Sequence, residues 1–143
     1  MIGYLLDSSA LWRILRDPKI HELWRDAAVD GDLRSCYPMR SEFLRSARNL
    51  KEHSQLCAMF DASYRDVAVP KSAELWIAGL QWRAAEHGNH QCLSVVDLQI
   101  CATAAYHNLI VLHDDADYVT AARLATDLRQ RNVHDGPPGA DET

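Results

Sequence analysis

The sequence lacks several features that define common protein classes. Its four cysteines include no pair spaced as CxxC, which excludes zinc ribbons and thioredoxin-like redox motifs. Six glycines and five prolines in 143 residues are too few for a collagen-like or low-complexity chain. No apolar run approaches the ~18 residues of a membrane span, and the apolar run at residues 2–6 is too short for a signal peptide. We therefore expect a cytoplasmic protein with no membrane partner.

Motifs of nucleotide and acyl-transfer chemistry are also missing. The chain contains no GxGxxG fingerprint, no glycine-rich P-loop and no GxSxG nucleophile turn. Dinucleotide binding, P-loop nucleotide hydrolysis and serine-based acyl transfer therefore lack support.

Length and composition are those of one ordinary globular domain, with 48% hydrophobic and 24% charged residues. The net charge of −5 argues against a nucleic-acid-binding protein. The charge is unevenly distributed, however, because basic residues outnumber acidic ones in residues 1–51 and the reverse holds after residue 51. Arg40, Arg45, Arg48 and Lys51 crowd one short basic stretch, which is either a solvated helix face or a binding surface.

Short apolar runs alternate with helical patterns along the chain. Strands are predicted at residues 2–6, 33–36, 67–69, 109–112 and 132–133. Helices are predicted at residues 10–16, 20–28, 38–48, 50–62, 73–87, 94–107 and 116–126. This alternation predicts an α/β fold of three layers (α/β/α) with a mainly parallel sheet. We expect the domain to span residues 1–133 and residues 134–143, with two prolines and two glycines, to form a disordered tail.

Acidic residues follow the predicted strands or begin the predicted helices: Asp7, Glu42, Asp97, Asp114, Asp115 and Asp117. Each has a structural explanation, since Asp7 fits a helix N-cap and Ser94-x-x-Asp97 fits a capping box. Ligands of open parallel sheets, however, bind beyond the carboxyl ends of the strands. The pattern therefore predicts that several of these acids converge at one edge of the sheet.

Carboxylates that converge in this way have a chemical consequence. They repel one another, so their pKa values rise unless cations neutralise them. Mg²⁺ and Mn²⁺ prefer carboxylate and water oxygens as ligands. A site of this kind can activate a water and stabilise the attacking and leaving oxygens of a phosphodiester displacement.

Four stretches of the sequence resemble the signature stretches of one known family: YLLDSSALWRIL, PMRSEFLRSAR, SVVDLQICATAA and LIVLHDDADYVTAA. In this order they are similar to PIN-domain ribonucleases, and most similar to the VapC-like toxins of type II toxin–antitoxin systems. The resemblance extends from residue 1 to about residue 133. It implies a PIN-like domain with a parallel sheet of four or five strands.

The resemblance also implies roles for individual residues. It makes Asp7, Glu42, Asp97 and Asp115 the catalytic acids, with Glu42 binding metal or orienting the attacking water. The expected metal ligands are Asp7, Asp97, Asp115 and Asp117, and the implied cofactor is Mg²⁺, with Mn²⁺ as a substitute. Ser9 matches a small polar position beside the metal, whereas Asp114 stands at a variable position and is left outside the site.

The function implied by the resemblance is that of a Mg²⁺-dependent endoribonuclease toxin. Its substrate would be an RNA such as a tRNA, and its partner a VapB-like antitoxin whose C-terminal segment lies across the site. Homodimers are usual in the family. Arg13, Arg45 and Arg48 are candidates for contacts with RNA phosphates or with acidic antitoxin groups, and the sequence does not separate these two uses.

Two other interpretations stay open. The first is a PIN-like module that binds RNA or protein without cutting, although the intact set of acids argues against it. The second is a phosphorelay receiver, which also gathers acids at strand ends. A receiver requires an acidic pair after the first strand and a lysine after a later one, whereas Ser8 and Ser9 follow Asp7 here.

Overall fold

The computed structural model describes residues 2–139 and is built on a sheet of four parallel strands. The strand order is β2-β1-β3-β4. The strands are β1 (Tyr4–Leu6), β2 (Leu33–Arg34), β3 (Ile110–His113) and β4 (Arg129–Asn132). The predicted α/β class and parallel sheet are confirmed.

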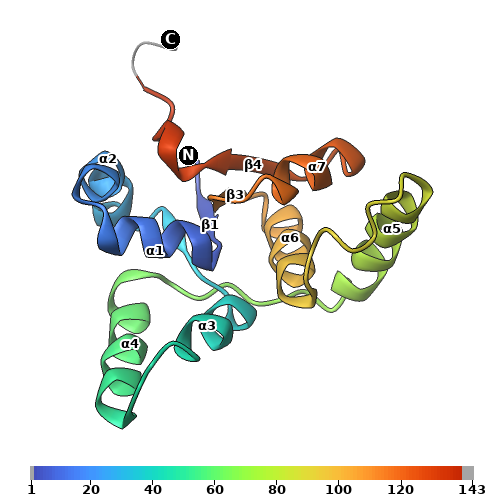
Figure 1. The fold of residues 1–143 in the computed structure, drawn as a ribbon. Helices are drawn as coiled ribbons and strands as arrows, with labels where there is room; N and C mark the ends of the chain where they lie inside the picture. The colour runs from blue at the N-terminus through green and yellow to red at the C-terminus, as the bar shows by residue number, and fades with distance from the viewer. Residues whose placement is uncertain (1, 140–143) are drawn as a thin grey trace.

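Helices cover both faces of this sheet (Figure 1). They are α1 (Ser8–Arg16), α2 (Pro18–Val29), α3 (Tyr37–Leu44), α4 (Leu50–Ser63), α5 (Ala73–Glu86), α6 (Val95–His107) and α7 (Asp117–Leu124). The connection from β1 to β2 runs across the sheet in the opposite direction to the connection from β2 to β3. Because such crossovers are right-handed, α1 and α2 lie on one face and α5 and α6 on the other. The predicted three layers are confirmed.

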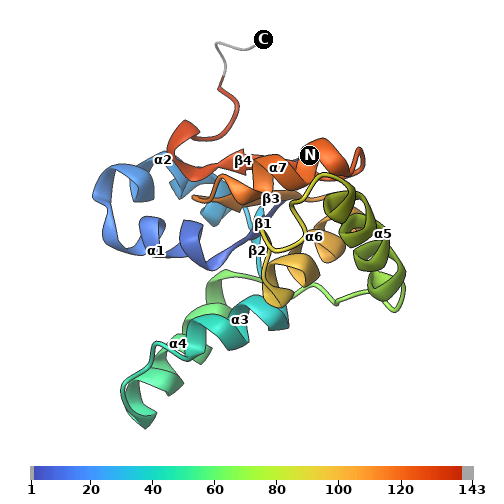
Figure 2. The same cartoon turned by 45° about the vertical axis from the view of Figure 1, so that its right-hand side comes forward.

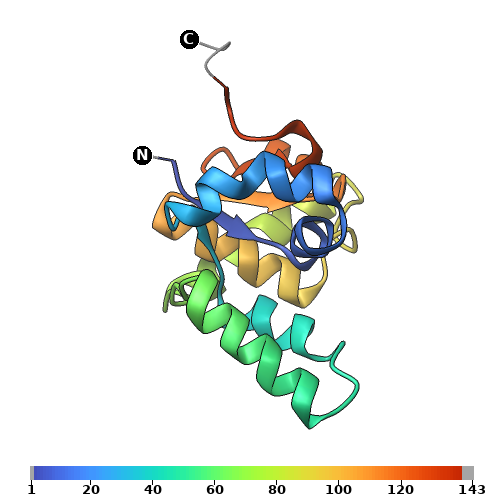
Figure 3. The same ribbon diagram turned by 90° about the vertical axis from the view of Figure 1, so that its left-hand side faces the viewer.

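The pair α3 and α4 projects away from the sheet as a helical hairpin (Figures 2 and 3). Aromatic contacts anchor it to α1, since the Trp12 ring stacks on Phe43 with centroids 4.3 Å apart. Phe43 in turn meets Phe60 of α4 edge-on at 5.7 Å. The hairpin is therefore fixed at its base, while its far end, at residues 45–50, is exposed apart from the half-buried Ala47.

The central strands β1 and β3 are buried except for the half-buried Ile110, as the continuous apolar runs indicate. Leu5, Leu6, Val111 and Leu112 have no exposed surface, because helices cover both faces of the parallel sheet. The strand β4 is different, since all four of its residues are polar and, among the described strands, it pairs with β3 alone at the sheet edge.

Three predicted elements differ from the structure in kind or by more than two residues at one end. The strand predicted at residues 67–69 is wrong, because only an isolated bridge between Ser35 and Asp66 forms there. The helix predicted to reach residue 48 ends at Leu44, so Arg45 and Arg48 lie in the loop that follows α3. The edge strand predicted at residues 132–133 spans residues 129–132 instead, because pairing with β3 outweighs its polar composition.

The C-terminal stretch also differs from the expectation of a tail that is disordered from residue 134. A 3₁₀ helix, η1 (Val133–Asp135), follows β4, and the indole N–H of Trp24 donates to the Val133 carbonyl at 2.8 Å. The Arg131 guanidinium donates to the Gly136 carbonyl. Residues 140–143 lie outside the described residues. Within residues 2–139, no helix is long and apolar enough to span a membrane.

We expect Trp24→Phe to destabilise the protein by about 1–3 kcal/mol, because the buried Val133 carbonyl loses its donor. Chemical denaturation of the variant and the wild type measures this difference. Trp82→Phe is the matched control, since the Trp82 side chain is exposed and donates only to Glu86 of its own helix. Equal midpoints for Trp24→Phe and wild type would contradict the anchoring role of η1.

Candidate active site

Asp7 lies at the carboxyl end of β1, where it also begins α1 as the N-cap. Its backbone N–H donates to the Leu112 carbonyl of the neighbouring strand at 2.9 Å. Its Oδ2 accepts from the Ser9 backbone N–H at 3.1 Å and from the Ser9 hydroxyl at 2.5 Å. Only 5% of Asp7 is exposed. The predicted N-cap is thus confirmed, and it fixes a buried carboxylate at the sheet edge.

Asp97 reaches the same place from the first turn of α6. It forms the predicted capping box, in which the Asp97 N–H donates to Ser94 Oγ at 3.1 Å and the Ser94 N–H donates to Asp97 Oδ2 at 3.4 Å. The box holds the Asp97 side chain with its other oxygen, Oδ1, directed at the buried Tyr118.

Tyr118 links these two acids. Its side chain is wholly buried, and its hydroxyl lies 2.8 Å from Asp7 Oδ1 and 3.0 Å from Asp97 Oδ1. Burial, together with the charges of Asp7 and Asp97, raises the pKa of Tyr118 well above its usual range. The group therefore keeps its proton and serves as a hydrogen-bond donor between the two carboxyl groups.

Asp115 and Asp117 follow β3 and form a second pair. The Asp117 backbone N–H donates to Asp115 Oδ1 at 2.9 Å, and the Asp115 N–H donates to His113 Nδ1 at 3.0 Å. Since His113 Nδ1 accepts, the proton of the neutral ring is on Nε2, which donates to Gln130 Oε1 at 2.7 Å. The buried imidazole of His113 also stacks on the Tyr118 ring at 5.0 Å.

The pKa values of two acids rise, as the crowding of carboxylates predicts, but repulsion is not the main cause. Burial contributes most to the raised pKa of Asp97, and the charge of Asp7 adds to it. Burial also contributes most to the raised pKa of Asp117, followed by the charge of Asp115. Asp97 and Asp117 are therefore both shielded from water and close to another negative charge.

The other predicted acids lie apart from these two pairs. Glu42 is half-buried on α3, a helix that contacts α1 and α6, and it forms no hydrogen bond or ion pair with the other predicted acids in the described part of the chain. Asp114 pairs with Arg13 at 2.7 Å and with His134 at 3.2 Å. Although burial acts to raise it, these two partners lower the pKa of Asp114. Asp114 is therefore bound by two basic side chains and is not part of either acid pair.

The residues present suit a hard divalent cation. Within residues 2–139, neither Asp7 nor Asp97 has a Lys or Arg partner, and both are held only by neutral donors. Two carboxylates around one hydroxyl, without a countercharge, form an oxygen-rich donor set of the kind that Mg²⁺ and Mn²⁺ prefer. In the same described range, no three acid, histidine or cysteine side chains are already grouped as a metal site, so Asp115, Asp117 or Glu42 would have to move toward the first pair.

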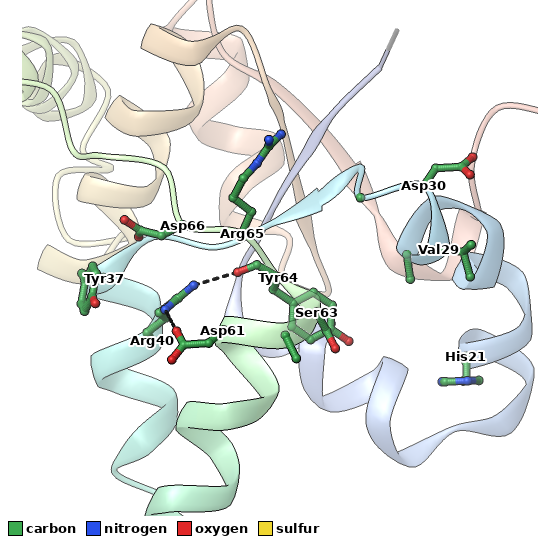
Figure 4. Close-up of a pocket in the computed structure, with 13 residues that line it drawn as sticks. His21, Val29, Asp30, Tyr37, Arg40, Asp61, Ser63, Tyr64, Arg65 and Asp66 are labelled. Atoms are coloured by element: carbon green, nitrogen blue, oxygen red, sulfur yellow. Dashed lines mark hydrogen bonds and ion pairs between the residues drawn. The ribbon is translucent and has the colours of Figure 1, made fainter.

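An open cavity of about 880 Å³ lies elsewhere, between the end of α2 and the base of the α3–α4 hairpin (Figure 4). Arg40, one of the two arginines that line it, is almost fully buried and donates to Ser35 Oγ, the Tyr64 carbonyl and Asp61. Because these partners occupy its guanidinium, Arg40 serves to join α3 to α4, and the basic stretch predicted around it is partly structural.

A comparison with protein families identifies the family of this chain. The family model described as PIN domain matches residues 4–124, which include both acid pairs, Glu42 and Tyr118. The chain belongs to the PIN-domain family. The predicted resemblance is thereby confirmed.

Related PIN-domain proteins carry informative names. The chain is 54% identical over 106 residues to a Mycobacterium tuberculosis protein named Ribonuclease VapC6, covering 74% of this chain and 84% of the relative. It is 29% identical over 127 residues to Ribonuclease VapC21 of the same species, covering 89% of each. The VapC-like character expected from the sequence is therefore confirmed.

Solved structures share the PIN fold at low sequence identity. The structure of VapBC2 from Rickettsia felis, bound to a DNA fragment from its promoter, superposes with a TM-score of 0.73 at 13% identity, covering 92% of this chain and 98% of the other. VapBC-1 from nontypeable Haemophilus influenzae gives a TM-score of 0.72 at 16% identity, covering 94% and 99%.

Sequence reasoning missed three residues that organise the site: Tyr118, His113 and Gln130. Tyr118 directly follows Asp117, but an aromatic side chain in a helix is usually part of the core. His113 ends an apolar strand. Gln130 lies on β4, which the sequence pattern predicted at residues 132–133 instead of 129–132. No sequence signal marks their mutual contacts, because these contacts depend on how β3, β4 and α7 pack.

We expect Asp97→Asn to raise the metal-free melting temperature near neutral pH by a few degrees. Because the pKa of Asp97 is raised above the usual 3.8, the folded protein holds a proton that the unfolded chain releases. This contribution to stability is complete below the unfolded pKa and is lost as pH rises through the folded pKa. The asparagine removes the charge while its carbonyl still accepts from Tyr118. Its amide group faces the Ser94 N–H in place of Oδ2, so only the longer of the two contacts, at 3.4 Å, is lost.

Thermal melts in EDTA across the acidic and neutral range measure this effect. Asp26→Asn is the control, since the Asp26 side chain is 94% exposed and remote from the pair. A pH profile for Asp97→Asn that coincides with that of the wild type would show that the Asp97 charge is not destabilising.

Proposed function

We propose that this PIN-domain protein is a Mg²⁺-dependent endoribonuclease, with Mn²⁺ as a working substitute, and the toxin of a VapBC-like toxin–antitoxin pair. The observation that carries the proposal is the pair formed by the buried Asp7 and the half-buried Asp97, held at the carboxyl edge of the sheet without a cationic partner in the described part of the chain. The similarity to proteins named ribonucleases supports the substrate class.

The chemistry assigned to each residue follows from its surroundings. Asp7, Asp97, Asp115 and Asp117 would hold the metal ion, which would supply charge stabilisation for the phosphodiester and a more acidic water. Ser9 orients the Asp7 carboxylate through two hydrogen bonds. Glu42, which is half-buried on α3 and not tied to the other acids, binds metal or accepts a proton from the attacking water.

Asp7→Asn and Asp97→Asn should each lower the rate of RNA cleavage a hundredfold or more, because each removes one charge from the electrostatic site. Cleavage of a labelled RNA by purified protein measures the rate. EDTA should stop the reaction, and Mg²⁺ or Mn²⁺ should restore it.

Asp26→Asn is the matched control, since it removes the same charge from a fully exposed site on α2. Wild-type rates for Asp97→Asn would remove that residue from the site. Intact RNA after prolonged incubation of the wild type with either metal would favour the PIN-like binding module that does not cut.

The three candidate arginines fall into two groups. Arg13 lies on α1 beside the acids, where its guanidinium pairs with Asp114 and lines an open cavity with Ser9. Arg45 and Arg48 lie in the loop at the far end of the projecting hairpin, and Arg48 pairs with Glu52. The proposal assigns Arg13 to RNA phosphates, and Arg45 and Arg48 to acidic groups of a VapB-like antitoxin. The VapBC complexes of the same fold support such a partner.

Arg13→Gln should weaken RNA binding and reduce its dependence on salt by about one phosphate contact. Arg48→Gln should leave RNA binding unchanged and weaken the complex with the antitoxin encoded beside this chain. For RNA binding, each substitution is made in the cleavage-deficient Asp97→Asn variant. For antitoxin binding, each is made in the wild-type protein. If both substitutions weaken RNA binding equally, Arg13 and Arg48 belong to one RNA-binding surface and the separate assignment is wrong.

A homodimer and a cytoplasmic location complete the proposal. An apolar groove of about 690 Å³ between α3 and α5, lined by the exposed Tyr37 together with Ala73 and Ile77, offers a surface for a second copy. An enzyme that cleaves RNA such as tRNA acts where that RNA is, which for a bacterial-type toxin is the cytoplasm.

A further inference from the structure

Within residues 2–139, the Tyr118 side chain hydrogen-bonds to both Asp7 and Asp97, and nothing in the ribonuclease assignment requires a hydroxyl there. Its oxygen lies within hydrogen-bond distance of Asp7 Oδ1 and Asp97 Oδ1, which come from the end of β1 and the start of α6. Tyr118 itself belongs to the first turn of α7. One hydroxyl thus joins three elements that are far apart in the sequence.

The ring of Tyr118 is held so that its hydroxyl has little freedom to turn away. The side chain is wholly buried, and one face stacks on His113 at an interplanar angle of 30°. His113 is fixed in turn by the Asp115 N–H and by Gln130 of the edge strand. The hydroxyl is therefore the end of a rigid chain of contacts that begins at β4.

A hydroxyl has a single proton, so it donates fully to only one of the two carboxyl groups at a time. The second carboxyl group nevertheless lies within hydrogen-bond distance of the same hydroxyl oxygen. A carboxylate oxygen has more than one lone pair, so an oxygen that accepts from Tyr118 still has capacity for a cation. The contact therefore orients both acids without blocking them.

We propose that Tyr118 is a positioning residue that sets the spacing of the Asp7 and Asp97 carboxylates, so that this half of the metal site is assembled before the ion binds. The inference rests on the metal site proposed above. Groups that orient metal ligands from outside the coordination shell affect metal affinity or activity by about 10–100-fold when removed.

The test uses Tyr118→Phe, which keeps the ring over His113 and deletes only the hydroxyl. We expect its Mn²⁺ dissociation constant, measured from the EPR signal of free Mn²⁺, to rise by about 10–100-fold. The Mn²⁺ concentration that gives half-maximal RNA cleavage should rise in parallel. Tyr64→Phe is the matched control, because Tyr64 is also buried but belongs to the hairpin. The Mn²⁺ affinity of this variant should equal that of the wild type.

A double variant separates positioning from general loss of stability. If Tyr118 acts through Asp97, then Asp97→Asn combined with Tyr118→Phe should weaken Mn²⁺ binding by less than the product of the two single effects. Melts in EDTA confirm that each variant is folded at the assay temperature. Multiplicative effects in the double variant would assign Tyr118 a structural role only and overturn the proposal.

Two further outcomes test the role of Tyr118 and the metal site separately. Wild-type Mn²⁺ affinity in Tyr118→Phe, with weakened binding in Asp97→Asn, would overturn the role of Tyr118 and leave the metal site standing. Absence of Mn²⁺ binding by the wild-type protein would overturn the metal site, and the positioning role with it.

Discussion

The burial of the Asp7 carboxylate is the constraint on which the rest of the site depends. A carboxylate that is 5% exposed needs hydrogen bonds on both oxygens, since an unsatisfied buried charge is costly. Ser9 supplies the donors on one side and Tyr118 the donor on the other. The Ser9 hydroxyl also accepts from the Asp114 N–H, which ties the start of α1 to the loop after β3. The buried Asp7 carboxylate is thus linked, directly or through Ser9, to the start of α1, the loop after β3 and α7.

The fold makes this burial possible because its strands are parallel. The chain leaves β1 and β3 at the same edge of the sheet, and their register places Leu6 beside Leu112 just before the acids begin. α6 packs against both strands, which brings its first turn and Asp97 to the same edge. Local capping and the active site are therefore not competing explanations, because Asp7 and Asp97 stabilise helix starts with one oxygen and face the site with the other.

The split between the two acid pairs has a physical meaning. Asp7 and Asp97 are linked through Tyr118, whereas Asp115 and Asp117 are linked through a backbone N–H, and Glu42 lies on a separate helix. Burial and repulsion raise the pKa of Asp97 and of Asp117, so bringing the pairs together without a countercharge would cost further free energy. At the proposed metal site a divalent cation would remove that cost, so the approach of the two pairs and the binding of the ion would be one process.

The sequence by itself determined the fold class, the order of the main elements and the acids at the strand ends. These features follow from local patterns, such as apolar runs for buried strands and Ser94-x-x-Asp97 for a helix start. It did not determine the edge strand β4, the end of α3 at Leu44 or the roles of Tyr118, His113 and Gln130. Those were decided by the tertiary structure, because a polar strand forms only when a neighbour pairs with it. A buried tyrosine, likewise, becomes part of a site only when two carboxylates from distant segments are packed against its hydroxyl.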